Sequence, residues 1–176
     1  MAFSVTRSLR QSASNDYRAS TGRKQKMRRK EREIKDRKVI DVIIRRCRVC
    51  RLAMCDEGQP YVVPLNFGYD GQFLYFHSAL EGRKIDIIKR NNRVCFEFDI
   101  LHDIVKAKLA CDWGAKYESV IGSGTVEILN TLKAKKEALE CIMRQYGGNA
   151  NDFSDEILKK TMILRVRIIE ISGKAK

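Results

Sequence analysis

Apolar and polar residues alternate along much of this chain with the two-residue period of half-buried strands. The pattern predicts strands at about 48–55, 60–69, 72–78, 93–100, 117–129 and 161–171. Short links join the first three of these segments, and Asp70–Gly71 is a strong two-residue hairpin signal. We therefore expect residues 48–78 to form an antiparallel meander, in which strand 60–69 lies beside strand 72–78.

Helices are expected around these strands, at 36–46, 85–90, 131–146 and 155–160. Asp36 is a favourable N-cap for the first helix, and Gly147–Gly148 ends the third. Residues 101–116 follow neither period and are expected to be less regular. Gly122 and Gly124 interrupt strand 117–129, which indicates a bulge, or the close approach of a ligand or of another backbone.

These elements describe a mainly β protein with peripheral helices. A chain of 176 residues can build one domain with a substantial core and some excess. A small barrel is the economical arrangement of mostly antiparallel strands, because closure removes exposed sheet edges. We assign this single domain to residues 31–176. The apolar runs are far shorter than a membrane span, so no transmembrane helix and no membrane partner are expected.

Positive charge is concentrated at the N-terminus. Of the formal net charge of +13, +8 falls in residues 1–30 and +5 in the rest of the chain. This Ser- and Arg-rich segment lacks the apolar stretch of a secretion signal, and we expect a disordered extension or a start upstream of a native Met27. A mitochondrial-type presequence and an arm that binds nucleic acid are the alternatives. No pattern of aromatic residues suited to stacking accompanies the charges, so nucleic acid is not an expected partner.

The six cysteines are expected to be free thiols in a reducing cytoplasm. Cys47 and Cys50 have the spacing of half a zinc site, but no second pair follows and only two histidines are present, so no metal site is predicted. His102 is expected to be a surface loop residue, and Asp112 and Glu118 form no evident acid–base pair. P-loop, Rossmann and nucleophile-elbow motifs do not occur.

The stretch HSALEGRK, residues 77–84, is the most informative candidate site. It links a strand end to a helix start and puts Arg83 and Lys84 at the first helical turn, where the helix dipole alone disfavours cations. A phosphate would explain them, because free backbone amides and two cations would surround it. Ser78 could meet a ligand oxygen, and Gly82 allows tight backbone geometry. A solvated loop with surface charges is the alternative.

The strand PYVVPLNF, residues 60–67, is a second candidate feature. Pro64 cannot donate to a sheet ladder, so this strand is expected at an edge or a bulge. Main-chain groups left free there could bond a flat heteroaromatic ligand. An ordinary edge strand that contains a proline is the alternative.

The segment from Asp56 to Asp99, which contains both stretches, resembles the flavin-binding split-barrel family, as does ACDWGAKYESVIGSGTVEI at 110–128. It is most similar to the branch called 5-nitroimidazole-resistance proteins, grouped with the pyridoxamine 5′-phosphate oxidase-like proteins. The resemblance extends from about Met27 to the C-terminus. It implies a six-stranded antiparallel split barrel that forms a homodimer, with two FMN molecules at the dimer interface.

The resemblance also implies roles for individual residues. Residues 61–66 would line the isoalloxazine edge through main-chain groups, and Arg83 and Lys84 would bind the phosphate. Residues in and just before strand 117–129 would approach the flavin, either from the same subunit or from its partner. The implied cofactor-binding set is Tyr61, Val62, Val63, Pro64, Leu65, Asn66, Tyr75, Ser78, Arg83, Lys84, Trp113, Tyr117, Ser119 and Gly122.

The implied activity is that of an FMN-dependent oxidoreductase that reduces a small substrate of the nitroaromatic, 5-nitroimidazole type. His77 is the candidate catalytic residue, as a proton donor or a stabiliser of negative charge. A structural His77 that bonds a nearby carbonyl is the alternative. FAD is the alternative cofactor, since the phosphate site suits the FMN portion of either, and no motif identifies the electron donor.

Two rival functions follow from the same resemblance. One is a flavin or haem carrier, or a redox sensor, without rapid turnover, because a fold alone does not fix a function. The other is pyridoxamine 5′-phosphate oxidation. Enzymes with that activity carry a basic residue early in the strand that matches PYVVPL, and an arginine-rich C-terminal segment. Here the strand is apolar and the chain ends in RVRIIEISGKAK, which argues against vitamin B6 oxidation.

Overall fold

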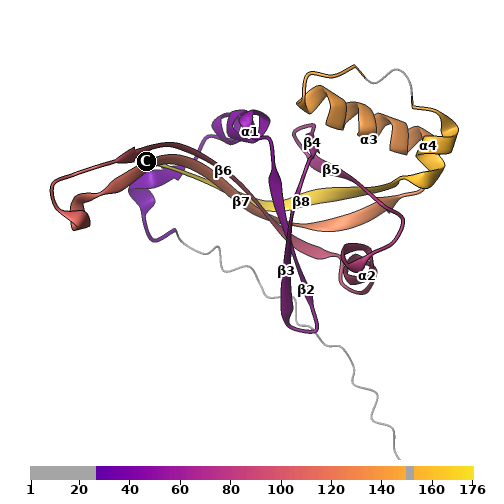
Figure 1. The fold of residues 1–176 in the computed structure, drawn as a ribbon, viewed down its shortest axis with the longest axis horizontal. Helices are drawn as coiled ribbons and strands as arrows, with labels where there is room; N and C mark the ends of the chain where they lie inside the picture. Colours follow the sequence, from indigo (N-terminus) through magenta and orange to yellow (C-terminus); the bar gives the residue numbers. More distant parts are fainter. Residues whose placement is uncertain (1–26, 150–152) are drawn as a thin grey trace, which may run out of the picture.

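The fold is built on an eight-stranded antiparallel sheet, seen in a computed structural model that describes residues 27–149 and 153–176 (Figure 1). The strand order is β3-β2-β6-β7-β8-β5-β4, and β1 pairs separately with β8. The strands are β1 (Glu33–Ile34), β2 (Cys50–Asp56), β3 (Gln59–Leu65), β4 (Gly68–Tyr69), β5 (Phe73–Ser78), β6 (Arg93–Val105), β7 (Gly114–Leu129) and β8 (Met162–Ala175). The predicted extension, residues 1–30, lies outside the described residues except for its last four.

The predicted helices are confirmed within two residues at each end: α1 (Arg37–Arg46), α2 (Arg83–Arg90), α3 (Leu132–Gln145) and α4 (Asp155–Lys160). Short 3-10 turns occupy Lys30–Arg32 and Ala110–Asp112. Asp36 caps α1 by accepting a hydrogen bond from the Lys38 amide at 2.8 Å. None of the helices in the described ranges is long and apolar enough to cross a membrane.

The predicted meander is wrong in its third strand. The expected strand 60–69 divides at Asn66–Phe67 into β3 and the two-residue β4. The Asp70–Gly71 turn therefore joins β4 to β5, and β5 pairs with β8 on its other side. Among the described residues β3 pairs with β2 alone, so Pro64 does lie on an edge strand, but β5 is not its neighbour.

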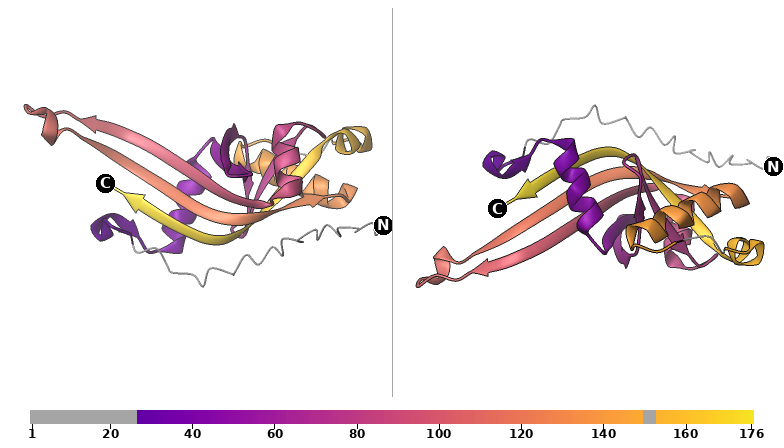
Figure 2. Two further views of the ribbon diagram at one scale, coloured as in Figure 1. Left: turned by 90° about the horizontal axis from the view of Figure 1, so that it is seen from below. Right: turned by 90° about the horizontal axis from the view of Figure 1, so that it is seen from above.

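The segment 101–116 is more regular than expected. Strand β6 continues to Val105 and β7 begins at Gly114, so the two form a long hairpin whose tip projects beyond the rest of the molecule (Figure 2). We call residues 101–117 the β6–β7 arm. A register shift between Leu101 and Asp103 breaks the alternation, which explains why the pattern looked irregular. The predicted bulge near Gly122 is confirmed by a second shift, between Ser123 and Gly124.

The architecture is consistent with the expected split barrel, although eight strands are present rather than six, because the two-residue β1 and β4 join the longer strands. In the described part of the chain, β3 and β4 end the strand order without pairing to each other, so hydrogen bonds do not close the sheet. This opening leaves one edge of β3 free.

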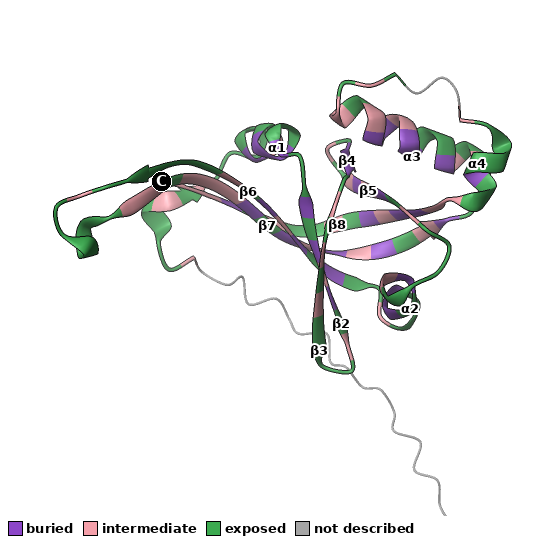
Figure 3. Cartoon of the chain, viewed as in Figure 1, coloured by how far each residue is buried: buried purple, intermediate pink, exposed green. Residues whose placement is uncertain are grey.

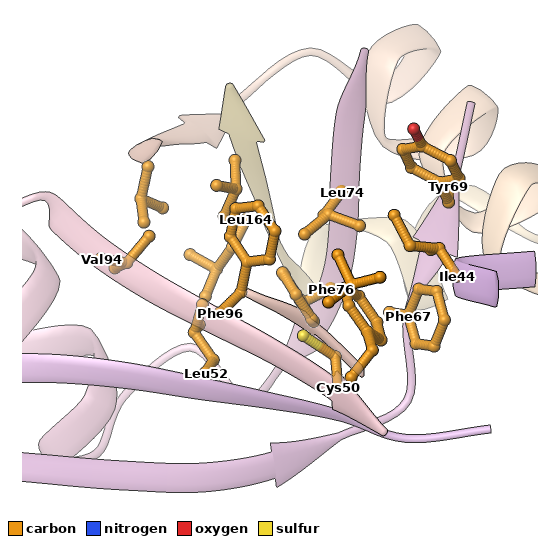
Figure 4. Close-up of a cluster of buried hydrophobic side chains, with 14 of the residues drawn as sticks. Ile44, Cys50, Leu52, Phe67, Tyr69, Leu74, Phe76, Val94, Phe96 and Leu164 are labelled. Carbon is orange, nitrogen blue, oxygen red and sulfur yellow. The ribbon is translucent and has the colours of Figure 1, made fainter. Parts of the chain in front are cut away.

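A buried apolar cluster fills the concave side of the sheet (Figures 3 and 4). Alternate residues of β2, β5 and β6 supply it, including Leu52, Phe76 and Phe96, which are fully buried. Phe67 leaves the sheet after β3 and packs on Phe98, with 4.8 Å between ring centroids. Helices α1 and α2 cover this core, while α3 and α4 pack on a smaller cluster beside β7 and β8. The core thus fixes α2 against the sheet, which positions the candidate site.

Candidate functional site

The end of β5 and the start of α2 form one compact turn. Gly82 precedes α2 with φ of 121°, a left-handed conformation that favours glycine, and no side chain caps the helix start. The amides of Ile85 and Asp86 donate to the Gly82 carbonyl, which leaves the amides of Arg83 and Lys84 without an intrahelical acceptor. Arg83 and Lys84 open this helix, as the sequence predicts, so free amides and two cations are gathered at one place.

Arg83 reaches across to the edge strand. Its guanidinium carbon lies 4.5 Å from the ring centroid of Tyr61 in β3, within the range of a cation–π contact. Two further contacts hold α2 beside the β2–β3 hairpin: Arg90 donates to both carboxylate oxygens of Asp56 at 3.0 and 2.6 Å, and Asn91 donates to the Cys55 carbonyl at 3.0 Å. Helix α2 is therefore held against the β2–β3 hairpin at both of its ends, with Arg83 beside β3.

Lys84 is half-buried, and burial lowers the pKa of its ammonium group. No carboxylate, carbonyl or hydroxyl of the described residues pairs with this amine. Burying a cation without a partner is unfavourable, because the lost hydration is not replaced. An anion that bound beside the α2 start would supply the missing partner.

The free edge of β3 offers main-chain groups. Pro60 and Pro64 are four residues apart, so their ring nitrogens face the same edge. Because β3 pairs with β2 along its whole length and a proline nitrogen cannot donate, we expect both nitrogens to face the free edge. The same alternation directs the amide and carbonyl of Val62 to that edge. At this edge the Val62 amide can donate a hydrogen bond to a planar ligand, and the Val62 carbonyl can accept one from it.

His77 and Ser78 end β5 and point to opposite sheet faces. His77 pairs in register with Ile163 and Ser78 with Met162, both at the start of β8. The His77 ring is exposed and makes no hydrogen bond within the described chain, so it does not bond the nearby carbonyl that a structural role would require. The imidazole is available to a ligand.

The remaining predicted residues are not gathered at this place. Tyr75 donates from its hydroxyl to Asp70 at 2.7 Å, at the other end of β5. Trp113 lies at the tip of the β6–β7 arm, far from α2 in this chain, where its ring nitrogen donates to the Ala107 carbonyl at 2.8 Å (Figure 1). Tyr117 exchanges main-chain hydrogen bonds with Lys176.

Ser119 and Gly122 lie in the middle of the long hairpin. Ser119 is half-buried and pairs with Asp99 of β6 and Lys174 of β8. A Cβ atom at Gly122 would overlap the Phe96 ring and the Glu170 carbonyl. Packing within the barrel therefore explains this glycine without a ligand.

Two arrangements were not predicted from the sequence. His102 lies in β6 rather than in a loop, with Nε2 2.9 Å from a carboxylate oxygen of Glu118, which also pairs with Arg46 at 2.8 Å. The Tyr61–Arg83 contact joins residues on separate elements, so no local pattern could indicate it.

All six cysteines are free, and the described residues contain no group of three potential metal ligands from His, Cys, Asp and Glu.

Comparison with known proteins gives matches over most of the chain. Residues 36–175 match the family described as pyridoxamine 5′-phosphate oxidase. A candidate 5-nitroimidazole antibiotic resistance protein from Bacteroides thetaiotaomicron has a similar structure, with a TM-score of 0.74 and 36% identity over 81% of this chain and 85% of that one. A Mesorhizobium loti FAD-binding protein is 25% identical, with a TM-score of 0.62 over 82% of this chain and 97% of that one.

More distant matches are also present. A flavocytochrome from Azotobacter vinelandii shares the fold, with a TM-score of 0.76 at 19% identity over 86% of this chain and 72% of that one. An uncharacterised Rhizobium meliloti protein is 39% identical over 49 residues. That match spans 28% of this chain and about a third (32%) of the length of that curated relative.

Proposed function

Because this chain belongs to the pyridoxamine 5′-phosphate oxidase family, we propose that it is a flavin-dependent oxidoreductase that reduces a small nitroaromatic substrate of the 5-nitroimidazole type. The branch is suggested by the similarity to the Bacteroides protein described as a candidate for 5-nitroimidazole resistance. The apolar strand β3 and the absence of a basic residue early in it argue against vitamin B6 oxidation.

The observation that carries this proposal is the half-buried, unpartnered Lys84 beside Arg83 at an uncapped helix start. Two cations, free amides and the nearby hydroxyl-bearing Ser78 suit a phosphate monoester. The free edge of β3 lies next to this group through the Tyr61–Arg83 contact and suits a planar ring system. A phosphate and a flat heteroaromatic ring together match FMN; FAD carries the same portion and is the alternative.

The residues of this chain would bind and orient the cofactor and would protonate the substrate. Arg83 and Lys84 would hold the phosphate, and Val62 would fix the ring edge by main-chain bonds. A bound flavin would supply the redox chemistry, since none of the side chains of these elements can do so. His77, exposed at the end of β5, would donate a proton to the reduced substrate or stabilise its developing negative charge.

A homodimer would complete this site. The β6–β7 arm exposes the apolar side chains of Leu101, Ile104, Val105, Leu109 and Trp113, which range from 38 to 59% exposed. Large apolar patches on a surface usually mark an interface. We propose that the arm of one subunit packs on the other, so that Trp113 and Tyr117 would approach the partner's flavin rather than their own.

A visible spectrum of the purified protein tests the cofactor. We expect flavin bands, either as purified or after addition of FMN. Under anaerobic conditions a chemical reductant should bleach them, and a 5-nitroimidazole should restore them. Reduced flavin that never reoxidises, or a Soret band, would instead favour a carrier or sensor. A colourless protein that FMN cannot reconstitute would overturn the cofactor assignment.

Replacement of His77 tests its role separately. His77→Ala should leave FMN affinity within about twofold, because the phosphate and ring contacts come from other residues. Turnover should fall by about 10²-fold or more if the imidazole acts as a general acid. Single-turnover reoxidation of the reduced protein by a nitroimidazole measures this step. An unchanged rate would remove His77 from the chemistry.

A further inference from the structure

A cavity of about 310 Å³ opens between α1, the β4–β5 turn and β8. The cavity lies at the start of β5, whereas the proposed flavin site lies at the end of β5, at His77, Ser78 and the α2 start. The two sites are therefore separate in this chain. The volume of the cavity is at the lower end of the range for small-molecule sites. Residues from all three elements line it, among them Arg37, Gln72, Phe73, Arg167, Ile169 and Ile171.

Arg37 is fixed in place by three partners. Its Nε donates to Asp41 at 2.8 Å, and its Nη2 donates to the Tyr69 hydroxyl and to the Gly71 carbonyl, both at 2.9 Å. The Tyr69 hydroxyl in turn donates to Asp41 at 2.6 Å. The guanidinium is thus held at the wall of the cavity, with its second terminal nitrogen not used by these bonds.

Arg167 is positioned but not neutralised. Its guanidinium lies over the ring of Phe73, 5.0 Å from the centroid, and the two residues pair directly across β5 and β8. Arg165, two residues earlier, flanks the same ring at 4.8 Å but also forms an ion pair with Glu127 at 2.7 Å. Within the described residues no carboxylate lies in ion-pair range of Arg167.

Two acidic side chains near the cavity, those of Asp41 and Asp70, are already engaged. The Asp41 carboxylate bonds Arg37 and Tyr69. Asp70 accepts from the amides of Gln72 and Phe73 at 2.9 and 2.8 Å, and from the Tyr75 hydroxyl. No acidic residue lines the cavity itself, which leaves its wall positive. The side-chain amide of Gln72 makes no hydrogen bond to any described residue and adds a free donor.

We propose that this cavity is a second ligand site, which binds a phosphate monoester with an apolar body. Arg37 of α1, Arg167 of β8 and Gln72 of the turn line the same cavity, and their several donors suit the several oxygens of a phosphate. Ile169, 62% exposed, and Ile171 follow Arg167 along β8, also line the cavity and suit an apolar body. This site does not depend on the proposed flavin chemistry.

Calorimetric titration of the full chain with phenyl phosphate tests the proposal. The protein is first loaded with FMN and then freed of unbound FMN, so that any phosphate site at Arg83 is filled and no free FMN competes for the cavity; FMN binding is measured separately. We expect saturable binding that Arg167→Gln weakens about tenfold or more, because a charge-assisted contact is lost. The matched control is Arg165→Gln, which removes an equal charge two residues away and should change binding less than twofold.

Further titrations separate the contribution of the phosphate group from that of the apolar body. Inorganic phosphate and phenol should each bind more weakly than phenyl phosphate, and Gln72→Ala should weaken phenyl phosphate as Arg167→Gln does, though less. The proposal is overturned if the wild-type chain does not bind phenyl phosphate, if both arginine variants lose equal affinity, or if phenol binds as tightly. Thermal unfolding of each variant confirms that the exposed substitutions leave the fold intact.

Discussion

At the scale of single residues, Tyr61 joins the two halves of the candidate flavin site. Its ring holds the Arg83 guanidinium at 4.5 Å and so limits the directions that this long side chain can take. A cation–π contact at a partly exposed site contributes about 0.5–1 kcal/mol. Tyr61→Leu should therefore raise the FMN dissociation constant about two- to fivefold, as measured by quenching of flavin fluorescence.

The control for this prediction is Tyr61→Phe, which keeps the ring and removes the hydroxyl. It should bind FMN like the wild type. If the two variants lose equal affinity, then the hydroxyl rather than the ring is responsible, and Arg83 is not positioned by stacking.

Lys84 should make flavin binding depend on pH. Burial lowers its pKa in the free protein, so this proton is lost at a lower pH than from an ordinary lysine. A bound phosphate would stabilise the ammonium and raise the pKa again. Binding would then take up a proton between the two pKa values, and the FMN dissociation constant should rise with pH through that window, which begins below the pKa of an ordinary lysine, about 10.4.

Substitutions at Lys84 separate its titration from that of other groups. Lys84→Arg keeps a charge at every accessible pH, so the rise should disappear. Lys84→Gln should bind FMN weakly at all pH values and also show no rise. A slope that persists in both variants would show that another group titrates.

At the scale of elements, local signals were readable from the sequence and pairings were not. Asp36 and Gly147 mark helix ends through caps formed by near neighbours, and both predictions are confirmed. The Asp70–Gly71 turn is likewise a local signal. The strand that follows it, β5, however also pairs with β8, which lies about ninety residues later in the sequence. For the same reason the cations at 83 and 84 were identifiable, whereas the contact between Arg83 and Tyr61 was not.

The central glycine of β7 shows how close packing limits one strand. A methyl group at Gly122 would meet the Phe96 ring and the Glu170 carbonyl, neither of which can move freely. Gly122→Ala should lower the free energy of unfolding by about 1–3 kcal/mol, the usual cost of overpacking. Urea denaturation of flavin-free protein measures this, because a packing effect does not require the ligand.

The same strand offers a matched control. At Gly114 an added Cβ would meet only the flexible end of the Lys176 side chain. Gly114→Ala should therefore change the unfolding free energy by less than about 0.5 kcal/mol. A loss at Gly122 that appears only in the presence of FMN would point to ligand contact instead of packing.

At the scale of the whole molecule, the β6–β7 arm is the part least explained by a single chain. It projects away from the core, yet Leu101 and Leu109 are 58 and 59% exposed. We expect light scattering after size exclusion to give twice the 20.3 kDa chain mass. The double variant Leu101→Gln/Leu109→Gln should shift the protein toward monomer, because it removes apolar area from the proposed interface.

The control is Lys108→Gln/Lys116→Gln, which introduces the same side chain at exposed polar positions of the same arm and should leave the mass unchanged. Since the partner's arm is proposed to cover the flavin, the monomeric variant should also release FMN on dilution. A monomer that retains its flavin would place the whole cofactor site within one chain. A wild-type protein that is monomeric at all concentrations would contradict the dimer and remove the proposed role of Trp113.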